Sequence, residues 1–506
     1  MTNEKSSVEL RADNAHLDSV GIASTQTIES SAGRTRNEHD LLGERDVPVD
    51  VYWGIHTMRA VENFPITGVA IGHFSEFVRA LVYVKQAAAR ANKRLGYLPG
   101  AKAEAIERAC DIIGNEGKHH DQFVVDTVQG GAGTSTNMNT NEVVANLALE
   151  LIGREKGDYS TLHPNDDVNM SQSTNDAYPT SLRLAIIFAA DPLIAALDEL
   201  AYAFKAKAVE FGNVPKIGRT QLQDAVPMTL GQEFDGFFVT IKEDVSRLKE
   251  AAALFREVNL GATAIGTGIN ADPRYAALAV EELSRIARQP LVQASNLIEA
   301  TSDMGAFVLF SGVLKRIAVK LSKICNDLRL LSSGPRAGFA EIRLPAVQAG
   351  SSIMPGKVNP VIPEVVNQVA FMVIGHDLTV TMCAEGGQLQ LNAFEPTIGY
   401  CLLSSMRHLT AALATLTTRC INGIEADTER CLALVEDSIG LVTALGPFLG
   451  YEASSRVAKR ALAERRKVAE IVLEEELLTR AQLDQLLKIE TMICPSRHQI
   501  LAPGSA

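Results

Sequence analysis

The chain has 506 residues, of which 46% are hydrophobic and 21% are charged. This length and composition are typical of a soluble protein with two or three structural units, each with its own buried core. Its formal net charge of −12 argues against an extended basic face for nucleic acid or anionic lipid. A protein this acidic must create positive potential locally if its substrate is an anion.

Residues 1–38 are polar and of mixed charge, without the apolar core of a signal peptide or the acid-poor composition of a transit peptide. We therefore expect a disordered extension there.

Apolar stretches are short, as where Leu184–Ala190 meets Asp191, and none approaches the roughly 18 residues that span a membrane. The neighbours His119 and His120 do not share a helix face, which favours a structural role over a metal site.

The cysteines show neither a CxxC pair nor the spacing of metal ligands. There are seven: Cys110, Cys325, Cys383, Cys401, Cys420, Cys431 and Cys494. Scattered cysteines of this kind predict reduced thiols in a cytoplasmic protein.

The first strong helical pattern runs from Phe77 to Leu95, where apolar residues recur at alternating steps of three and four. Two segments rich in Gly, Ser, Thr and Asn follow, at Gly130–Glu142 and Asn169–Asp176. The first is a glycine run that opens into a helix, and its amides and hydroxyls suit an anion. The second presents side chains that suit a carboxylate or an ammonium group. Taken alone, each is better interpreted as a helix cap.

A third polar segment, Gly218–Pro227, is predicted to be a loop that leads into the next helix. That helix spans Leu230–Phe255, and Thr229 followed three residues later by Gln232 predicts a capping box at its start. Another helix is predicted over Phe307–Leu331, and the Ser-Ser-Gly-Pro run after it ends the helix. These apolar stripes indicate core packing and carry no chemistry by themselves. Helices this long form bundles that commonly associate with further copies, so we expect a homo-oligomer.

The fourth polar segment, Ala349–Pro360, is the most specific of the four. Two glycines and two prolines shape this loop, and Lys357 places a positive charge beside two serines. The stretch Gly350–Pro360 resembles the signature loop of the fumarase/aspartase superfamily. The other three segments resemble the remaining shared regions of that superfamily, in the same order and at compatible separations, from about Leu41 to the C-terminus.

Within the superfamily, the chain resembles the aspartate ammonia-lyases more than the fumarases. The runs Gln129–Ser135, Ser173–Asn175 and Val361–Val369 carry this similarity, and Gln221 stands where a fumarase normally has histidine. The resemblance implies a mainly α fold, with a central bundle of long helices flanked by smaller N- and C-terminal domains. The implied domains are an N-terminal domain over 39–175 after the extension, a bundle over 176–428 and a C-terminal domain over 429–506.

The implied reaction is the reversible deamination of L-aspartate to fumarate and ammonia, by anti elimination through an aci-carboxylate intermediate. Removal of the carbon-bound proton requires preformed donors where negative charge accumulates. By resemblance Ser351 is the general base, and its alkoxide needs loop amides and the nearby charge of Lys357. Further assignments are Thr220, Lys357 and Asn359 to the α-carboxylate; Ser173, Thr174 and Ser352 to the side-chain carboxylate; Thr134, Asn175 and Gln221 to the amino group; and Met354 to the substrate-binding set.

The resemblance also implies a homotetramer whose active sites are shared between subunits, acting on L-aspartate, fumarate and ammonia. No nucleic acid or membrane partner and no organic cofactor are expected, and activation by Mg²⁺ is left open. Gln221 has no titratable proton, so we expect ammonia to leave without acid help from this position. The alternatives are a fumarate hydratase and a helical scaffold that has lost activity, although Ser351, Lys357 and Asn359 speak against the latter.

Overall fold

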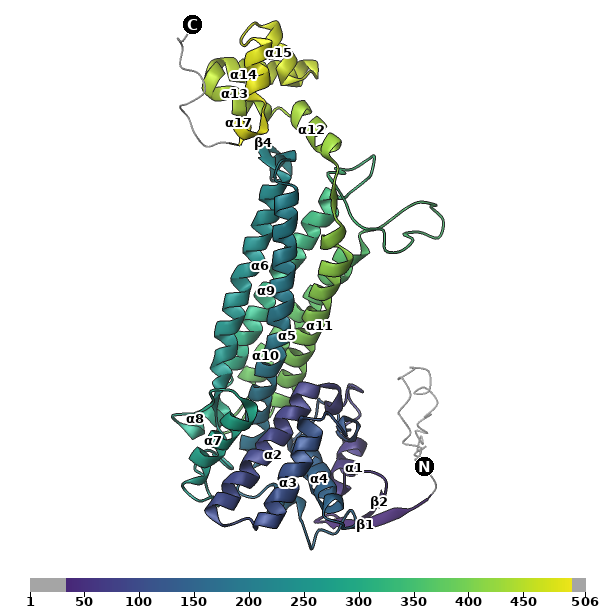
Figure 1. Cartoon of the computed structure of the whole chain (residues 1–506), viewed down its shortest axis with the longest axis vertical. Helices are drawn as coiled ribbons and strands as arrows, with labels where there is room; N and C mark the ends of the chain where they lie inside the picture. The colour runs from purple at the N-terminus through teal and green to yellow at the C-terminus, as the bar shows by residue number, and fades with distance from the viewer. Residues whose placement is uncertain (1–32, 494–506) are drawn as a thin grey trace, which may run out of the picture.

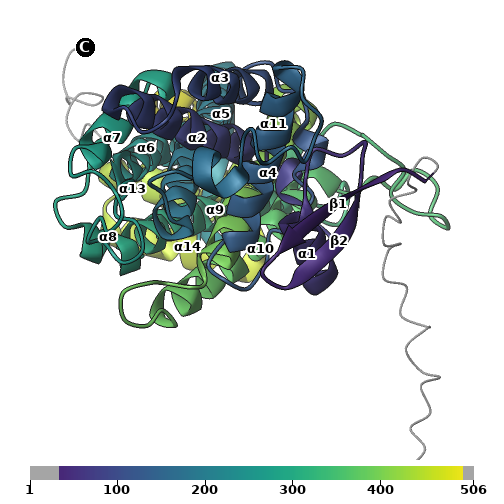
Figure 2. The ribbon, with the colours of Figure 1, turned by 90° about the horizontal axis from the view of Figure 1, so that it is seen from below.

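The computed structural model describes residues 33–493, which form three parts along one long axis (Figure 1). The mainly helical architecture predicted from the sequence is confirmed. The N-terminal part contains β1 (Thr35–Asp40), β2 (Gly43–Pro48), α1 (Ile55–Asn63), α2 (Ser75–Leu95), α3 (Gly100–Gly114) and α4 (Thr134–Leu151). Seen from below, along the long axis, the β1–β2 hairpin projects from one side of this part (Figure 2).

The central part is a bundle of long helices. They are α5 (Thr174–Glu210), α6 (Leu230–Ala253), α9 (Gly305–Leu331), α10 (Val361–Glu385) and α11 (Glu395–Arg419). Shorter elements at its ends are β3 (Pro215–Thr220), β4 (Gln223–Thr229), β5 (Glu257–Val258), α7 (Tyr275–Ala287), β6 (Val292–Gln293), α8 (Leu297–Ser302), β7 (Ile342–Arg343) and β8 (Glu425–Ala426). The pairs β1–β2, β3–β4 and β7–β8 are antiparallel, and β5–β6 is parallel.

The C-terminal part is a group of short helices at the far end of the bundle. They are α12 (Thr428–Asp437), α13 (Leu441–Leu449), α14 (Tyr451–Glu464), α15 (Val468–Glu474), α16 (Arg480–Leu486) and α17 (Ile489–Met492). This part has its own hydrophobic core, which includes Ile217 of β3. A second, larger core runs through the N-terminal part and the bundle. The β3–β4 hairpin therefore joins the C-terminal part to the bundle.

Short helical turns connect several of these elements. Four are 3₁₀ turns, Ile71–His73, His120–Gln122, Leu254–Arg256 and Ile421–Gly423, and Pro164–Val168 is a π-helical turn.

The three helices predicted from apolar spacing are confirmed as α2, α6 and α9. The predicted capping box is also present, since Gln232 N donates to Thr229 Oγ1 and Thr229 N donates to Gln232 Oε1, both at 3.0 Å. The predicted loop at Gly218–Pro227 is wrong, because these residues form most of the β3–β4 hairpin. Its turn lies at Gln221 and Leu222, whose φ angles of 53° and 63° fit a two-residue hairpin.

The predicted N-terminal extension falls largely on residues 1–32, which lie outside the described residues. Its last residues do not fit the prediction, because residues 35–38 belong to β1. Arg36 fixes this strand by donating to Glu38 Oε1 and to the carbonyl oxygens of Pro48, Val51 and Trp53. The local sequence does not predict this strand, because most of these hydrogen bonds are made to backbone carbonyls from later in the chain.

Six of the seven cysteines lie within residues 33–493, and none of these six forms a disulfide. Five are buried, and burial raises the pKa of each of their thiols. The seventh, Cys494, lies outside the described residues. The two adjacent histidines contact protein groups: the His119 ring lies edge-on to Tyr52, and His120 Nε2 is 3.0 Å from Ile113 O.

Candidate active site

Two of the four polar segments, residues 130–142 and 169–176, meet in the N-terminal part. We call them the threonine–asparagine cluster. A buried lysine lies at its centre: Lys85 Nζ donates to Asn137 Oδ1 at 2.6 Å, and to Asn169 Oδ1 and Gln172 Oε1 at 2.9 Å. Burial lowers the pKa of Lys85 to about 7. Only the ammonium form has three N–H donors for three oxygens, so these contacts favour the charged state.

The predicted substrate residues of the cluster are positioned by this network. Asn137 Nδ2 donates to Thr174 Oγ1 at 3.2 Å, so the Thr174 hydroxyl is tied to Lys85 through one side chain. Ser173 is the N-cap of α5, and Asn175 Nδ2 donates to Ala264 O at 2.7 Å. The hydroxyl of Thr134, at the start of α4, donates to Gly131 O. The structure therefore brings Thr134, Ser173, Thr174 and Asn175 together.

The electrostatics of the cluster suit a negative ligand. The N-termini of α4 and α5 meet here, and helix N-termini carry partial positive charge. Asp176 is a buried carboxylate of the cluster, and it accepts from the amides of Ser173, Gly261 and Thr263. Its burial raises the pKa to about 6. Lys85 and the helix ends thus supply the local positive potential that the acidic chain requires.

A glycine closes the cluster on the side of α5. Gly133, the N-cap of α4, has a φ of +91°, and a Cβ there would lie 2.3 Å from a ring carbon of Tyr178. Both the backbone conformation and the close approach of this ring require glycine.

The third segment supplies the hairpin tip, Thr220–Leu222, at the opposite end of the bundle from the cluster (Figure 1). These residues are exposed. The hairpin is held from below by the fully buried Glu341, whose carboxylate lies 2.8 Å from Arg219 Nη1 and 3.2 Å from Lys216 Nζ. Two predicted substrate residues, Thr220 and Gln221, therefore stand on a firmly anchored but exposed turn.

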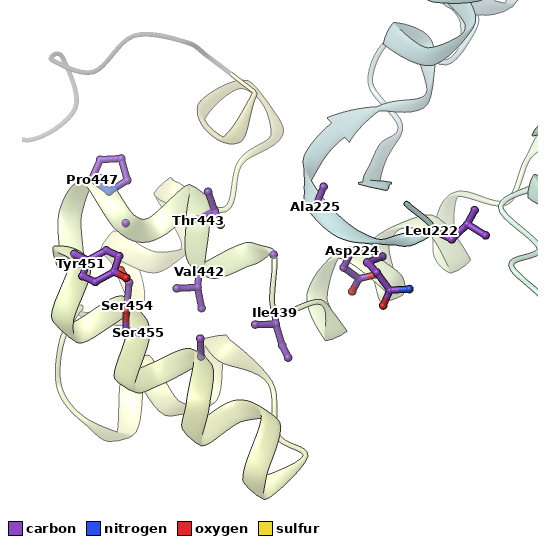
Figure 3. Close-up of a pocket in the computed structure, with 14 residues that line it drawn as sticks. Leu222, Asp224, Ala225, Ile439, Val442, Thr443, Pro447, Tyr451, Ser454 and Ser455 are labelled. Atoms are coloured by element: carbon purple, nitrogen blue, oxygen red, sulfur yellow. The ribbon is translucent and has the colours of Figure 1, made fainter. Parts of the chain in front are cut away.

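The hairpin also contacts the C-terminal part. Ser438 Oγ donates to Asp224 Oδ2 at 2.7 Å, and a Cβ on Gly440 would lie 2.1 Å from Ala225 O. Beside this contact, a cavity of about 1190 Å³ separates the hairpin from α13 and α14 (Figure 3). Asp224 is the only charged side chain among its lining residues. Of the hairpin tip, only Leu222 lines this cavity, and Leu222 is not among the predicted substrate residues. The cavity is therefore distinct from the predicted site.

The fourth segment, residues 349–360, is an exposed loop that we call the serine loop. Gly350 N donates to Lys357 O, and Asn359 Nδ2 donates to Gly350 O, both at 2.9 Å, so the base of the loop is closed. Ser351 Oγ accepts from the amides of Ile353 at 3.2 Å and Met354 at 3.1 Å. Two amides directed at this oxygen stabilise negative charge on it.

The charged and apolar side chains of the serine loop are free for contacts with other groups. Ser352, Met354 and Lys357 are exposed, and Lys357 forms no ion pair with the described residues. No hydrogen bond or ion pair joins the hairpin tip to the serine loop within residues 33–493. The predicted site residues of one chain therefore lie in three separate places.

The distance between these places follows from α5. This helix has 37 residues and connects the cluster, at Thr174, to the hairpin, which starts at Pro215. At about 1.5 Å per residue it is about 55 Å long. One small substrate therefore cannot touch Thr174 and Gln221 of the same chain.

Lys85 is the residue of the candidate site that the sequence analysis missed. A signal was available, because Lys85 falls four residues after Leu81 and three before Ala88, on the apolar stripe of its helix. A lysine on a stripe that faces the core needs buried acceptors. The amide-rich segments elsewhere in the chain provide them.

Residues 43–375 match the family described as lyase, and residues 441–494 match the fumarase C C-terminus. An aspartate ammonia-lyase from Pseudomonas canavaninivorans is 62% identical over 467 residues, which cover 92% of this chain and 98% of that protein. The chain belongs to the fumarase/aspartase superfamily.

Solved structures of this superfamily have the same fold. A fumarate lyase:delta crystallin from Brucella melitensis bound to cobalt is 61% identical, with a TM-score of 0.89 over 91% of this chain and 100% of that one. A class II fumarase from Schistosoma mansoni is 34% identical, with a TM-score of 0.85 over 91% of this chain and 99% of the fumarase chain. The fold is therefore shared across the superfamily, and sequence identity separates its members.

Proposed function

We propose that this protein catalyses the reversible deamination of L-aspartate to fumarate and ammonia, as a carbon–nitrogen lyase. The observation that carries this proposal is the 62% identity with an aspartate ammonia-lyase over 92% of the chain. Identity with the class II fumarase is much lower, at 34%. The glutamine at the hairpin tip, where fumarases normally have histidine, agrees with the choice of deamination over hydration.

The threonine–asparagine cluster suits the step in which a proton is removed from carbon. Loss of a proton from the carbon beside the side-chain carboxylate creates an aci-carboxylate with two negative charges, which needs preformed donors. Ser173 and Thr174, at the N-terminus of α5, offer hydroxyls and helix amides for this purpose. Thr134 and Asn175 lie beside them for the amino group. Lys85 holds these donors in place through Asn137, and in its ammonium form it also adds positive charge behind them.

The serine loop supplies the base. We assign proton abstraction to Ser351, since the amides of Ile353 and Met354 already point at its Oγ. Lys357 and Asn359 of the loop, with Thr220 of the hairpin, bind the α-carboxylate. Ser352 joins the donors to the side-chain carboxylate, and Met354 completes the binding set around the substrate. Gln221 contacts the amino group, and because it has no proton to titrate, ammonia leaves without acid help from this position.

The active form is a homotetramer whose sites are shared between subunits. The length of α5 supports this, because the three groups of site residues can meet only between copies. A second support is α10, whose most apolar stretch of 18 residues has a mean hydropathy of 1.2 but is only 33% buried. Phe371, Leu378 and Met382 on this helix are 60% exposed or more. Such a face is covered by another copy in an oligomer of long helices.

The apolar α10 is interpreted as a subunit interface and not as a membrane span. Its Asp377 forms an ion pair with Lys315 and accepts from Ser311, both on α9, so one side of the helix belongs to the bundle. We place the protein in the cytoplasm, without membrane or nucleic acid partners. The reaction needs no organic cofactor, and whether Mg²⁺ activates it is decided by assay with and without a chelator.

The activity is tested by following the ultraviolet absorbance of fumarate with aspartate or malate supplied. Turnover of aspartate but not malate is expected. Turnover of malate alone would make the protein a fumarate hydratase, and turnover of neither substrate would leave the inactive scaffold as the better description. A Gln221→His variant tests the hairpin residue separately, because a gain of hydratase activity there would show that position 221 selects the reaction.

Shared sites are tested by mixing two inactive variants, Ser351→Ala and Thr174→Ala. If each site takes its serine loop and its cluster from different chains, random mixed tetramers recover about one quarter of the sites. Each variant alone is the control. Mixed tetramers that are shown to form but remain inactive would contradict the shared arrangement.

A further inference from the structure

A cavity of about 400 Å³ lies between α2, α5 and the end of α7, outside the three groups of site residues. Arg79 and Tyr83 of α2, Phe188 of α5, Asn115 after α3 and Arg288 after α7 line it. Its volume is within the range of small-molecule sites. We call it the arginine cavity.

The two arginines of this cavity have no anionic partner. Neither Arg79 nor Arg288 forms an ion pair or a side-chain hydrogen bond within the described part of the chain. Arg79 is half-buried, and its Nε is buried without an acceptor. Its guanidinium carbon lies 3.9 Å from the centre of the Phe188 ring, a cation–π contact that positions the group. In a chain with 60 acidic and 48 basic residues, two such groups facing one cavity leave a local excess of positive charge.

The other polar groups around the cavity are already paired among themselves. Tyr83 OH donates to Asn115 Oδ1 at 2.5 Å, and Asn115 Nδ2 donates to Asp111 Oδ1 at 2.9 Å. Asp111, the nearby carboxylate, also accepts from Gln86. Asp111 accepts both amides at Oδ1, and its single negative charge offsets only part of the positive charge of the two arginines. Both arginines lie close enough to Tyr83 to oppose the rise that burial causes in its pKa.

The backbone at Arg288 also points to a use for this side chain. Arg288 is the C-cap of α7 and has a φ of 52°, a left-handed conformation that glycine adopts with less strain. The arginine at this position lines the cavity together with Arg79. The fold thus holds two guanidinium forks around one space, and such forks bind carboxylate and phosphate oxygens in pairs.

We propose that the arginine cavity is a binding site for a small dianion whose carboxylate or phosphate oxygens bridge Arg79 and Arg288 above the Phe188 ring. The site is separate from the threonine–asparagine cluster, although the same two helices, α2 and α5, serve both. Arg79 precedes Lys85 by six residues on α2, which is about 9 Å along the helix axis. This inference does not depend on the reaction proposed above.

The test is isothermal titration calorimetry of the full-length assembled protein with inorganic phosphate and, separately, with malonate. A dianion can also enter the active site, so variants assign the binding. Arg79→Gln and Arg288→Gly are each expected to weaken the affinity of the cavity by about tenfold to a hundredfold. Arg108→Gln is the matched control, because Arg108 is an exposed arginine of α3 without an ion pair to the described residues and does not line the cavity.

Arg288→Gly separates loss of binding from loss of folding. Glycine suits the backbone at this position, so the melting temperature should stay the same or rise while binding is lost. Binding of phosphate alone or malonate alone that is lost in both variants supports the site and identifies its anion. The proposal is overturned if neither anion binds at about 10 mM, a weak limit for any specific site, or if the variants bind as wild type does. Equal weakening by Arg108→Gln would also overturn it.

Discussion

The threonine–asparagine cluster and the serine loop contribute to the same predicted chemistry but are built in opposite ways. The cluster has a buried base, where Lys85 and Asn137 lie, and half-buried substrate residues at Ser173–Asn175. Its side chains are fixed by this lysine, two helix N-termini and a network of amides. The serine loop is exposed, and the hydrogen bonds described for it are made within the loop itself. Groups that stabilise a charged intermediate must be rigid before the substrate arrives. A loop that brings a base to the substrate has to remain accessible instead.

This difference predicts that changes in the loop affect activity alone, whereas changes in the cluster affect activity and stability together. The largest effect is expected for Ser351→Ala. Turnover of aspartate should fall by about a thousandfold or more, because the base is lost. The free energy of unfolding should change by less than about 1 kcal/mol, since the side chain is half-exposed and makes only local contacts. Unchanged turnover would remove Ser351 from the mechanism.

Lys85→Met tests the cluster. The change leaves three amide oxygens without their shared donor, and each buried oxygen without a partner costs about 1–3 kcal/mol. We expect a loss of about 3 kcal/mol or more in urea unfolding and about a hundredfold loss of turnover, because Thr174 is no longer held. Lys93→Met is the control on the same helix, where an exposed pair with Glu104 is worth less than about 1 kcal/mol. If Lys85→Met loses activity without losing stability, the contrast between cluster and loop fails.

Two glycines sharpen the comparison at the level of the backbone. Gly133 of the cluster and Gly356 of the loop both have positive φ, at +91° and +82°. A Cβ on Gly133 would meet the Tyr178 ring, whereas one on Gly356 would meet nothing within 4 Å. Gly133→Ala should therefore destabilise the protein by about 3 kcal/mol, and Gly356→Ala by about 1 kcal/mol. Equal melting temperatures for the two variants would contradict this account.

The smallest expected effect is a change in pH dependence. The pKa of Lys85 is lowered from 10.5 to about 7 in the folded protein. Between these values the unfolded chain holds a proton that the folded chain has released, so stability rises with pH, by at most about 1.4 kcal/mol per unit. Urea unfolding at about pH 7 and about pH 8 should show about 1 kcal/mol of this rise in the wild type and none in Lys85→Met. The same rise in both proteins would assign it to other groups.

The sequence was sufficient to predict helices that have one buried face. In α9 the apolar residues from Phe307 to Leu331 alternate with lysines and arginines, so their spacing is visible. The longest helix, α5, was not predicted, because the first half of it is buried on all sides and shows no polar face. Pro179 and Pro192 lie inside this helix, so tertiary burial overrode the local signal.

The candidate site was predicted as a set of residues but not as an arrangement. Resemblance supplied the identities of Thr134, Ser351 and the others, and it assigned sharing between subunits. It did not supply the geometry, because a polar segment looks the same whether it ends buried or exposed. Lys85 was missed for a related reason, since its acceptors are 52 to 87 residues away in the sequence.

The uninterrupted length of α5 limits how this protein can be altered. Each residue inserted into a helix adds about 1.5 Å and turns everything beyond it by about 100°. One extra residue in α5 would rotate the hairpin tip away from its present direction while leaving the cluster unchanged, and Gln221 would no longer lie where the proposed shared site requires it. Lengthening the bundle therefore requires matched insertions in all five of its long helices at once. The lengths of these helices can change only together.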